Sequence, residues 1–301
     1  MTLQASISNF ALLAIGMRVR AITGSVSDLD DFKSPKGDPG LFGPTSMTWQ
    51  VHAHFTAMMV GGLSSLIIQS LHPRALAAVW DHSDFRNKLK ERLGRTAYFV
   101  AMTTYGSEAK ALHAIGRVDA IHAHIRGVDL DGKAYVANEP DLIRWVHLAE
   151  VCSFLAAYQS LSKTPLTPSQ CDVYIQEMSR IGHLLGAVDL PSTWQATQEA
   201  LAAYRPELRH DERTREIIAV VENYPTDFLD KPFMHLTLKA AFDVMPAWVL
   251  AFIQRPPSCA LQAQANRLAL QLVSEPIQWM LDQQGVCAVA RQRVQAREAM
   301  A

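Results

Sequence analysis

Apolar residues recur at three- and four-residue spacing in almost every segment of this 301-residue chain, and this helical period limits the fold more than any other feature. Alternating Val- and Ile-rich runs between turn signals, which would indicate strands, are nearly absent. One short exception, Val128 to Val136, has Asp131-Gly132 as its turn and predicts at most a small hairpin. Because no long linker or internal repeat divides the chain, we expect a single large all-α domain over residues 1–301.

Local signals set the ends of the expected helices. Pro140 occupies a first-turn position for a helix that ends near Leu161. Pro246 and Pro276 should each kink or divide a later helix, because proline lacks the backbone donor that a helix interior needs. The expected helices span 46–70, 87–104, 107–125, 140–161, 167–185, 192–204, 211–221, 234–252 and 260–283.

The composition favours a large buried interior. Hydrophobic residues make up 49% of the chain, and charged residues make up 19%, against about 25% in an average soluble domain. The 28 basic and 29 acidic residues nearly cancel, so no overall field attracts nucleic acid. The four cysteines form no CxxC pair, which indicates free thiols in a reducing compartment.

Two apolar runs raise the question of membrane targeting. Phe10 to Met17 is followed, not preceded, by Arg18 and Arg20, so it predicts a short amphipathic helix instead of a secretory signal. Ala57 to Leu71 is interrupted by glycine and serine and is shorter than the roughly 20 residues that a membrane span needs. We therefore expect no stable membrane span and a cytoplasmic location.

Histidine is the most informative residue type for chemistry, and His147 is its sharpest case. It lies in the middle of the helix expected at 140–161, with Ile143, Arg144, Glu150 and Val151 at three- and four-residue steps on the same face. A neutral imidazole in such a place could bind iron, or it could be a core histidine hydrogen-bonded to a neighbour. Spacing alone leaves both readings open.

Other metal sites are poorly supported. The pairs His52/His54 and His122/His124 lie in expected helices, where residues two apart point in nearly opposite directions. A carboxylate-bridged di-iron bundle needs two Glu-x-x-His motifs, and only Glu207-Leu208-Arg209-His210 matches. Hydrolase elbows, phosphate-binding glycine loops and dinucleotide fingerprints are also missing.

A basic group on one helix face is the second clue. Arg92, Arg95 and Thr96 occupy adjoining positions, followed by apolar and aromatic residues. Arginines at such a boundary can bind carboxylates through two parallel hydrogen bonds, although a solvated helix edge has the same pattern.

Several motifs in this order resemble the DUF2236 family, which contains the MpaB-type oxygenases and the rubber-cleaving latex clearing proteins. The resemblance runs from about residue 37 to about 163. Its motifs are Gly37–Pro44, Thr48–His52, Leu71–Ala75, Asp81–Phe85, Arg95-Thr96 with Phe99, Thr104–Gly106, Ile121–Gly127 and Trp145–Phe154.

The resemblance implies an α-helical fold around a b-type haem. The family's proximal histidine lies in a Trp-Val-His helix, at the position of His147. An Arg-x-x-basic-Thr pattern near the haem of latex clearing proteins corresponds to Arg92, Arg95 and Thr96. His122 and Arg126 match another family pattern and are placed near the haem, as a distal or propionate-contacting pair.

The chain also departs from the latex clearing proteins. These carry an acidic residue, proposed as a catalytic base, upstream of the Arg-x-x-basic-Thr pattern. Here residues 75–80 contain no carboxylate, and Asp81 is the nearest. The departure counts against rubber cleavage.

The leading hypothesis is a haem b-dependent oxygenase that uses O2 on an apolar, unsaturated or lipid-like organic substrate, with a redox partner. His147 would hold the iron, Arg92 and Arg95 would anchor the propionates, and Arg144 and Arg126 are further cofactor-binding candidates. Thr96 and His122 would line the oxygen side as catalytic residues. The alternatives are a non-enzymatic haem protein (electron carrier, haem store or sensor) and a helical interaction protein that keeps the fold without the cofactor.

Overall fold

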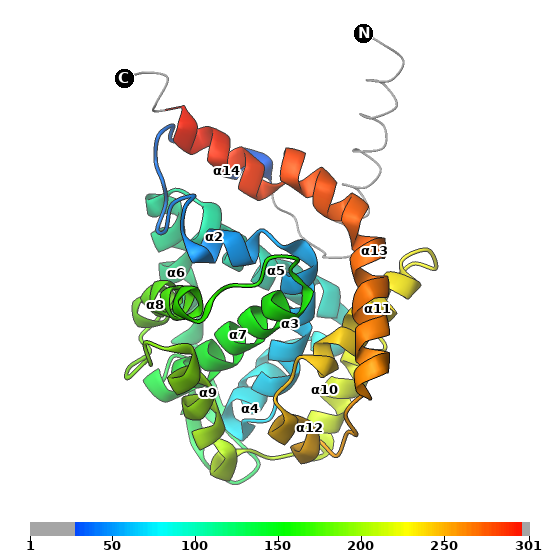
Figure 1. Ribbon diagram of the computed structural model, residues 1–301. Coiled ribbons are helices and arrows are strands. Elements are labelled where there is room, and N and C mark those ends of the chain that lie inside the picture. Colours follow the sequence, from blue (N-terminus) through cyan, green and yellow to red (C-terminus); the bar gives the residue numbers. More distant parts are fainter. Residues whose placement is uncertain (1–27, 297–301) are drawn as a thin grey trace.

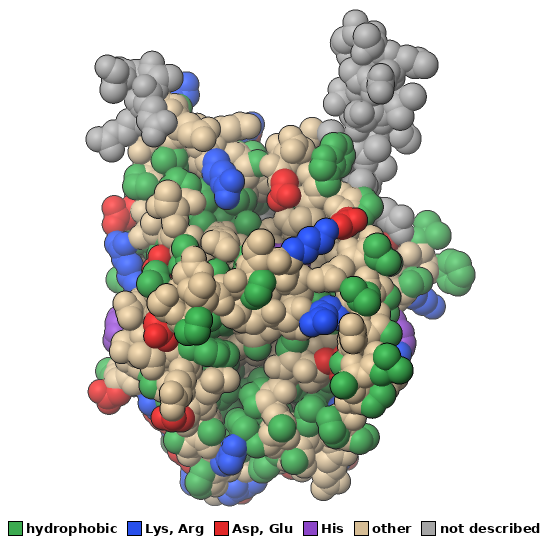
Figure 2. Space-filling model, viewed as in Figure 1, with side chains coloured by type: hydrophobic (Ala, Val, Ile, Leu, Met, Phe, Trp, Pro, Cys, Tyr) green, Lys and Arg blue, Asp and Glu red, His purple; other side chains and the backbone are tan. Residues whose placement is uncertain are grey.

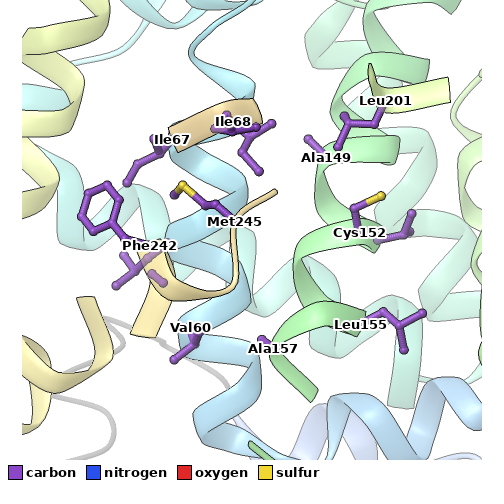
Figure 3. Packing of buried hydrophobic residues seen from close by; sticks show 14 of the residues in the cluster. Val60, Ile67, Ile68, Ala149, Cys152, Leu155, Ala157, Leu201, Phe242 and Met245 are labelled. Atoms are coloured by element: carbon purple, nitrogen blue, oxygen red, sulfur yellow. The ribbon is translucent and has the colours of Figure 1, made fainter. Parts of the chain in front are cut away.

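Two buried helices, α3 (Phe55–Gln69) and α7 (Pro140–Leu161), pack along each other at the centre of the computed structural model, which describes residues 28–296 (Figure 1). Gly61 of α3 makes this close approach possible, because a Cβ atom there would lie 2.7 Å from Cδ1 of Phe154 on α7. The resulting core includes Ile67 and Leu155 from the two helices and Phe242 from a later one (Figure 3). The amphipathic helix expected at 10–17 lies outside the described residues.

The other elements are arranged around this pair. In chain order they are η1 (Leu29–Phe32), α2 (Met47–His52), α4 (Pro73–His82), α5 (Phe85–Tyr105), α6 (Glu108–His122), α8 (Pro168–Leu184), α9 (Trp194–Ala203), η2 (Arg205–Glu207), α10 (Glu212–Glu222), α11 (Lys231–Asp243), α12 (Ala247–Phe252), α13 (Ala260–Gln284) and α14 (Val286–Gln295). One main cluster of buried apolar side chains draws on helices from α2 to α13. The expected mostly helical fold is confirmed.

The small hairpin is confirmed as well. Strands β1 (Arg126–Val128) and β2 (Ala134–Val136) pair antiparallel, with Gly127 opposite Tyr135. Gly132 adopts a φ of +78° in the turn, a conformation that glycine reaches without steric cost. The tyrosine hydroxyl donates a 2.9 Å hydrogen bond to Oδ2 of Asp81, which fastens the hairpin to α4.

Most helix ends fall within three residues of their expected positions. Two helix starts that were not expected have local causes. The run expected at 46–70 divides into α2 and α3, because the His54 side chain accepts the Ala57 amide and starts a new helix. Helix α4, which was not expected, starts in the same way at His72, with Pro73 in its first turn. Pro246 divides α11 from α12 as expected, whereas α13 continues through Pro276.

Contacts between distant segments fix the short α2. The Glu177 carboxylate on α8 accepts hydrogen bonds from the Met47 and Thr48 amides at 3.2 and 2.7 Å, and from the Thr48 hydroxyl at 2.8 Å. These amides are the unpaired donors of a helix start, and a negative charge stabilises that end of the helix. Helix α2 thereby lies beside both α7 and α8.

The surface carries charges of both signs, scattered singly over the face in view (Figure 2). Within residues 28–296 no single helix has the length and apolar composition to cross a membrane. Helices α3 and α4 meet those criteria only as a pair, with a bend of 103° between them.

Candidate functional site

His147 lies in the middle of α7, with 6% of its surface exposed. Among the described residues neither of its ring nitrogens has a hydrogen-bond partner. Burial, together with the charge of nearby His183, lowers the pKa of His147 to about 4. The ring is therefore neutral at neutral pH, and one of its nitrogens has a free lone pair for a metal ion.

A glycine on the facing helix makes room for this ring. A Cβ atom at Gly182 of α8 would lie 3.1 Å from Nδ1 and 3.2 Å from Cδ2 of His147, and 2.5 Å from Cδ1 of Leu190. The imidazole thus rests directly against the backbone of α8. Sequence reasoning missed this glycine; the only signal was its position inside an expected helix, where glycine is unfavourable by about 1 kcal/mol relative to alanine.

Arg92 and Arg95 lie one turn apart on α5 and have no carboxylate partner within residues 28–296. Burial lowers the pKa of the half-buried Arg92, and the positive charge of Arg95 adds to this effect. Thr96 is exposed beside them, and its hydroxyl donates a 3.3 Å hydrogen bond to the Arg92 carbonyl. This face of α5 therefore carries two positive charges that nothing in the described chain neutralises.

His122 lies close to this basic face. It is the last residue of α6, and its Nδ1 atom is buried without a hydrogen-bond partner. Burial lowers the pKa of His122, Asp119 opposes this effect, and the charge of Arg92 lowers the pKa again. The tertiary structure thus brings together Arg92 and His122, which sequence spacing could not relate to each other.

The two remaining arginine candidates differ in their surroundings. Arg144 of α7 is already partnered, because it donates hydrogen bonds to the Asp189 carbonyl at 3.3 Å and to the Tyr204 hydroxyl at 3.2 Å. Arg126 is exposed on β1, and its carbonyl oxygen lies 3.1 Å from Nε2 of His82. The described contacts bring neither arginine to His147 or to the basic face of α5.

Neither His-x-His pair forms a metal-binding pair. The ring nitrogens of His52 lie 2.7 Å from the Thr104 hydroxyl and 3.2 Å from the Tyr174 hydroxyl, so both are occupied. Its neighbour His54 caps α3 instead. In the second pair, Nδ1 of the exposed His124 lies 2.8 Å from a backbone carbonyl oxygen of the same helix.

An apolar cluster connects α8 with α5 and α6. Ile181 and Leu185, close to Gly182 along α8, pack with Phe99 of α5 and Ile115 of α6. Helices α5 and α7 have little direct packing, whereas α2 touches both. The candidate residues therefore lie on two pairs of helices, α5/α6 and α7/α8, joined by apolar side chains.

The sequence analysis named Glu150, one turn after His147 on α7, only as a same-face neighbour and gave it no role. Burial raises the pKa of this carboxyl group to about 7, and its charge acts on buried Tyr174. The signal was present in the sequence, since Glu150 lies at a three-residue step from His147 on an otherwise apolar helix.

A comparison with protein families gives one match, over residues 49–274, to the family described as "ER-bound oxygenase mpaB/B'/Rubber oxygenase, catalytic domain". The matched stretch is more than half of the chain and includes every candidate residue described above. Searches among curated proteins and among solved structures give no match. On the evidence of the family match, the chain belongs to the family of mpaB-type and rubber oxygenase catalytic domains.

Proposed function

We propose that the protein is a haem b-dependent oxygenase acting on an apolar organic substrate of unsaturated or lipid-like kind. His147 would bind the iron, and Arg92 and Arg95 would bind the two propionates. Thr96 and His122 would face the oxygen side. The observation that carries the proposal is the buried, neutral and unpartnered ring of His147.

The described residues fit a haem in two independent respects. An imidazole nitrogen is a common ligand of haem iron, and His147 would hold the iron with a nitrogen that no described protein group occupies. The propionates need cations, and Arg92 and Arg95 offer two guanidinium groups without carboxylate partners. Apolar side chains follow both groups along their helices, since Phe99 comes one turn after Arg95 on α5 and Ile181 precedes Gly182 on α8.

When bound, haem supplies the binding and reductive activation of O2. The chain's own residues would orient and shield it. The α8 backbone at Gly182 supports the His147 ring and limits its rotation. The unpartnered Nδ1 of His122 is free to exchange a proton or a hydrogen bond with a ligand. The surrounding apolar side chains exclude water, which strengthens each polar interaction with a ligand.

One observation favours a second candidate, a non-enzymatic haem protein that carries electrons or stores haem. His122 is a second half-buried histidine with an unpartnered nitrogen. If His122 also held the iron, the haem would have no free position for O2.

The test is the visible absorption spectrum of the protein, purified from cells supplied with a haem precursor. We expect a Soret band in the wild type that is lost in His147→Ala and retained in His235→Ala, which removes an exposed histidine from α11. A colourless wild-type protein with full helical content by circular dichroism would refute the haem assignment.

The same samples separate the two candidates. An oxygenase should bind carbon monoxide in the ferrous state without prior loss of a ligand, and His122→Ala should leave the iron's coordination unchanged. A carrier should show a six-coordinate ferrous spectrum that becomes five-coordinate in His122→Ala. Consumption of O2 with an unsaturated lipid and a chemical reductant would then test the oxygenase activity.

A further inference from the structure

Three side chains from distant parts of the chain converge at the start of α7. His72 precedes α4, Asp141 lies in the first turn of α7, and Glu207 ends η2. One ligand atom from each, an imidazole nitrogen and two carboxylate oxygens, lies within 4.8 Å of the other two. Separations of 65 residues or more along the chain mean that only the tertiary structure brings them together.

His72 points into this cluster with an unused nitrogen. Only 1% of its side chain is exposed, and its Nε2 atom is buried without a hydrogen-bond partner. The nearest charged atom is Oε2 of Glu207 at 3.8 Å, which is too far for a hydrogen bond. The ring lies between Trp145 and Tyr204, with centroid distances of 5.9 and 6.2 Å, so its orientation is restrained.

The ring is also electrically neutral. Burial lowers the pKa of His72 to about 4, the charge of Arg74 adds to this effect, and Asp141 and Asp129 oppose it. A neutral imidazole does not form an ion pair with Glu207, but it can bind a metal ion. The contact between His72 and Glu207 is therefore not an ion pair, and the imidazole nitrogen stays available to a metal ion.

The charges around the cluster favour a cation on balance. Asp129 adds a third carboxylate nearby, and its Oδ2 atom is buried without a hydrogen-bond partner. Two cations oppose it: Arg74, which lies 3.2 Å from Oδ2 of Asp141, and Lys133, whose charge lowers the pKa of His72. Arg144 is a third basic group, because it donates to the Tyr204 hydroxyl, which donates in turn to Asp141 at 2.7 Å. Glu139, which lies 2.6 Å from Arg74, is a fourth carboxylate, so four acidic groups face three basic groups.

We propose that His72, Asp141 and Glu207 bind a divalent transition-metal ion. Zn²⁺ is the ion with which the proposal is tested below. One imidazole nitrogen and two carboxylate oxygens are a ligand set that zinc accepts, with water in the fourth position. Mg²⁺ and Ca²⁺ prefer oxygen ligands alone and should bind more weakly.

Metal binding requires the three ligand atoms to move slightly closer together. Bonds of about 2.1 Å in a tetrahedron place ligand atoms about 3.4 Å apart, so no separation has to shrink by more than about 1.4 Å. Glu207 is 51% exposed and has room for this movement, whereas Asp141 is held by the Tyr204 hydroxyl at 2.7 Å and by Arg74 at 3.2 Å. Metal binding through Nε2 also places the ring proton on Nδ1, which gives up the long 3.5 Å hydrogen bond from the Ala75 amide.

This site does not depend on the proposed haem function, because none of its residues belongs to the groups around His147 and Arg92. Its position at the first turn of α7 suggests a structural role, in which the ion would fasten the start of this helix to α4 and η2. The metal would be a second one, separate from any iron at His147.

The test is calorimetric titration of the full-length protein with ZnCl2, after treatment with a chelator and desalting. Glu207→Gln removes one ligand charge from an exposed side chain without changing its size. Glu199→Gln, on an exposed part of α9, is the matched control. His72 stays unchanged because its side chain also caps α4.

We expect the wild type and Glu199→Gln to bind one Zn²⁺ with equal affinity, and Glu207→Gln to bind it at least about tenfold more weakly. Addition of Zn²⁺ should also raise the unfolding temperature of the wild type more than that of Glu207→Gln. A wild type that binds no Zn²⁺, or a Glu207→Gln variant that binds it as tightly as the wild type, would overturn the proposal. Neither outcome bears on the Soret band, so failure of this site is distinguishable from failure of the haem proposal.

Discussion

Gly61 and Gly62 are neighbours in α3, yet they face different surroundings. A Cβ atom at Gly61 would lie 2.7 Å from Cδ1 and 2.9 Å from Cα of Phe154, and 2.9 Å from the Ser153 carbonyl oxygen. A Cβ atom at Gly62 would have nothing within 4 Å. Substitution of each glycine by alanine therefore separates the effect of packing from the effect of helix propensity.

The expected change in stability combines two opposing effects, helix propensity and packing. Alanine stabilises a helix interior by about 1 kcal/mol relative to glycine, and this gain applies at both positions. At Gly61 two of the three close atoms belong to the α7 backbone, so α3 and α7 would have to move apart. Such overpacking costs about 1–3 kcal/mol. Because backbone atoms cannot rotate away, we take the upper end of this range, about 3 kcal/mol. After subtraction of the gain in helix propensity, Gly61→Ala should lower the free energy of unfolding by about 2 kcal/mol.

The measurement is urea unfolding of the wild type and both variants, followed by far-ultraviolet circular dichroism. Gly62→Ala should be more stable than the wild type by up to about 1 kcal/mol, which makes the variants differ by about 3 kcal/mol. Equal stability of Gly61→Ala and Gly62→Ala would refute the close approach of α3 and α7 at this point.

Three further predictions concern other parts of the molecule. Arg293 of α14 is 2% exposed and donates hydrogen bonds to four carbonyl oxygens, among them that of Tyr105 at 2.7 Å. Arg293→Met should therefore lower the free energy of unfolding by about 3 kcal/mol in urea, and a loss below about 0.5 kcal/mol would contradict this contact. Gly182→Ala should displace the His147 ring and reduce the Soret absorbance per protein more than it reduces helical content; an unchanged spectrum would contradict the role of this glycine. Burial lowers the pKa of His52 to about 3 and that of His147 to about 4, so both stay neutral in the folded protein while the unfolded chain binds protons below about pH 6.5. Stability should thus be constant with respect to these groups above about pH 6.5 and fall below it, by up to about 1.4 kcal/mol per pH unit for each histidine; urea midpoints that do not change between about pH 7 and pH 5 would contradict this.

The structure assigns a local role to the residue that departs from the latex clearing pattern. Asp81 is the carboxylate nearest to the position where those proteins carry an acidic residue. Its Oδ2 atom accepts the Tyr135 hydroxyl, and burial together with this hydrogen bond raises the pKa of Tyr135 to about 12. Asp81 therefore fastens the hairpin to α4.

Helix ends could be predicted because their signals are local. Pro140 is the first residue of α7, and Pro246 directly precedes the first residue of α12. Asp131-Gly132 forms the hairpin turn, as the conformational preference of glycine indicates. The division at His54 was missed because histidine is an uncommon helix cap, and its role depends on which way its ring turns.

In the candidate site, too, local relations could be predicted from the sequence and contacts between helices could not. The sequence by itself determined that His147 lies on an apolar helix, and that Arg92, Arg95 and Thr96 share a face of another, because helical periodicity relates residues within one element. Only the tertiary structure decided that Gly182 lies under the His147 ring, that His122 lies near Arg92, and that His72 meets Asp141 and Glu207. These contacts join residues between 30 and 135 positions apart along the chain, and they depend on how helices pack, which no local preference specifies.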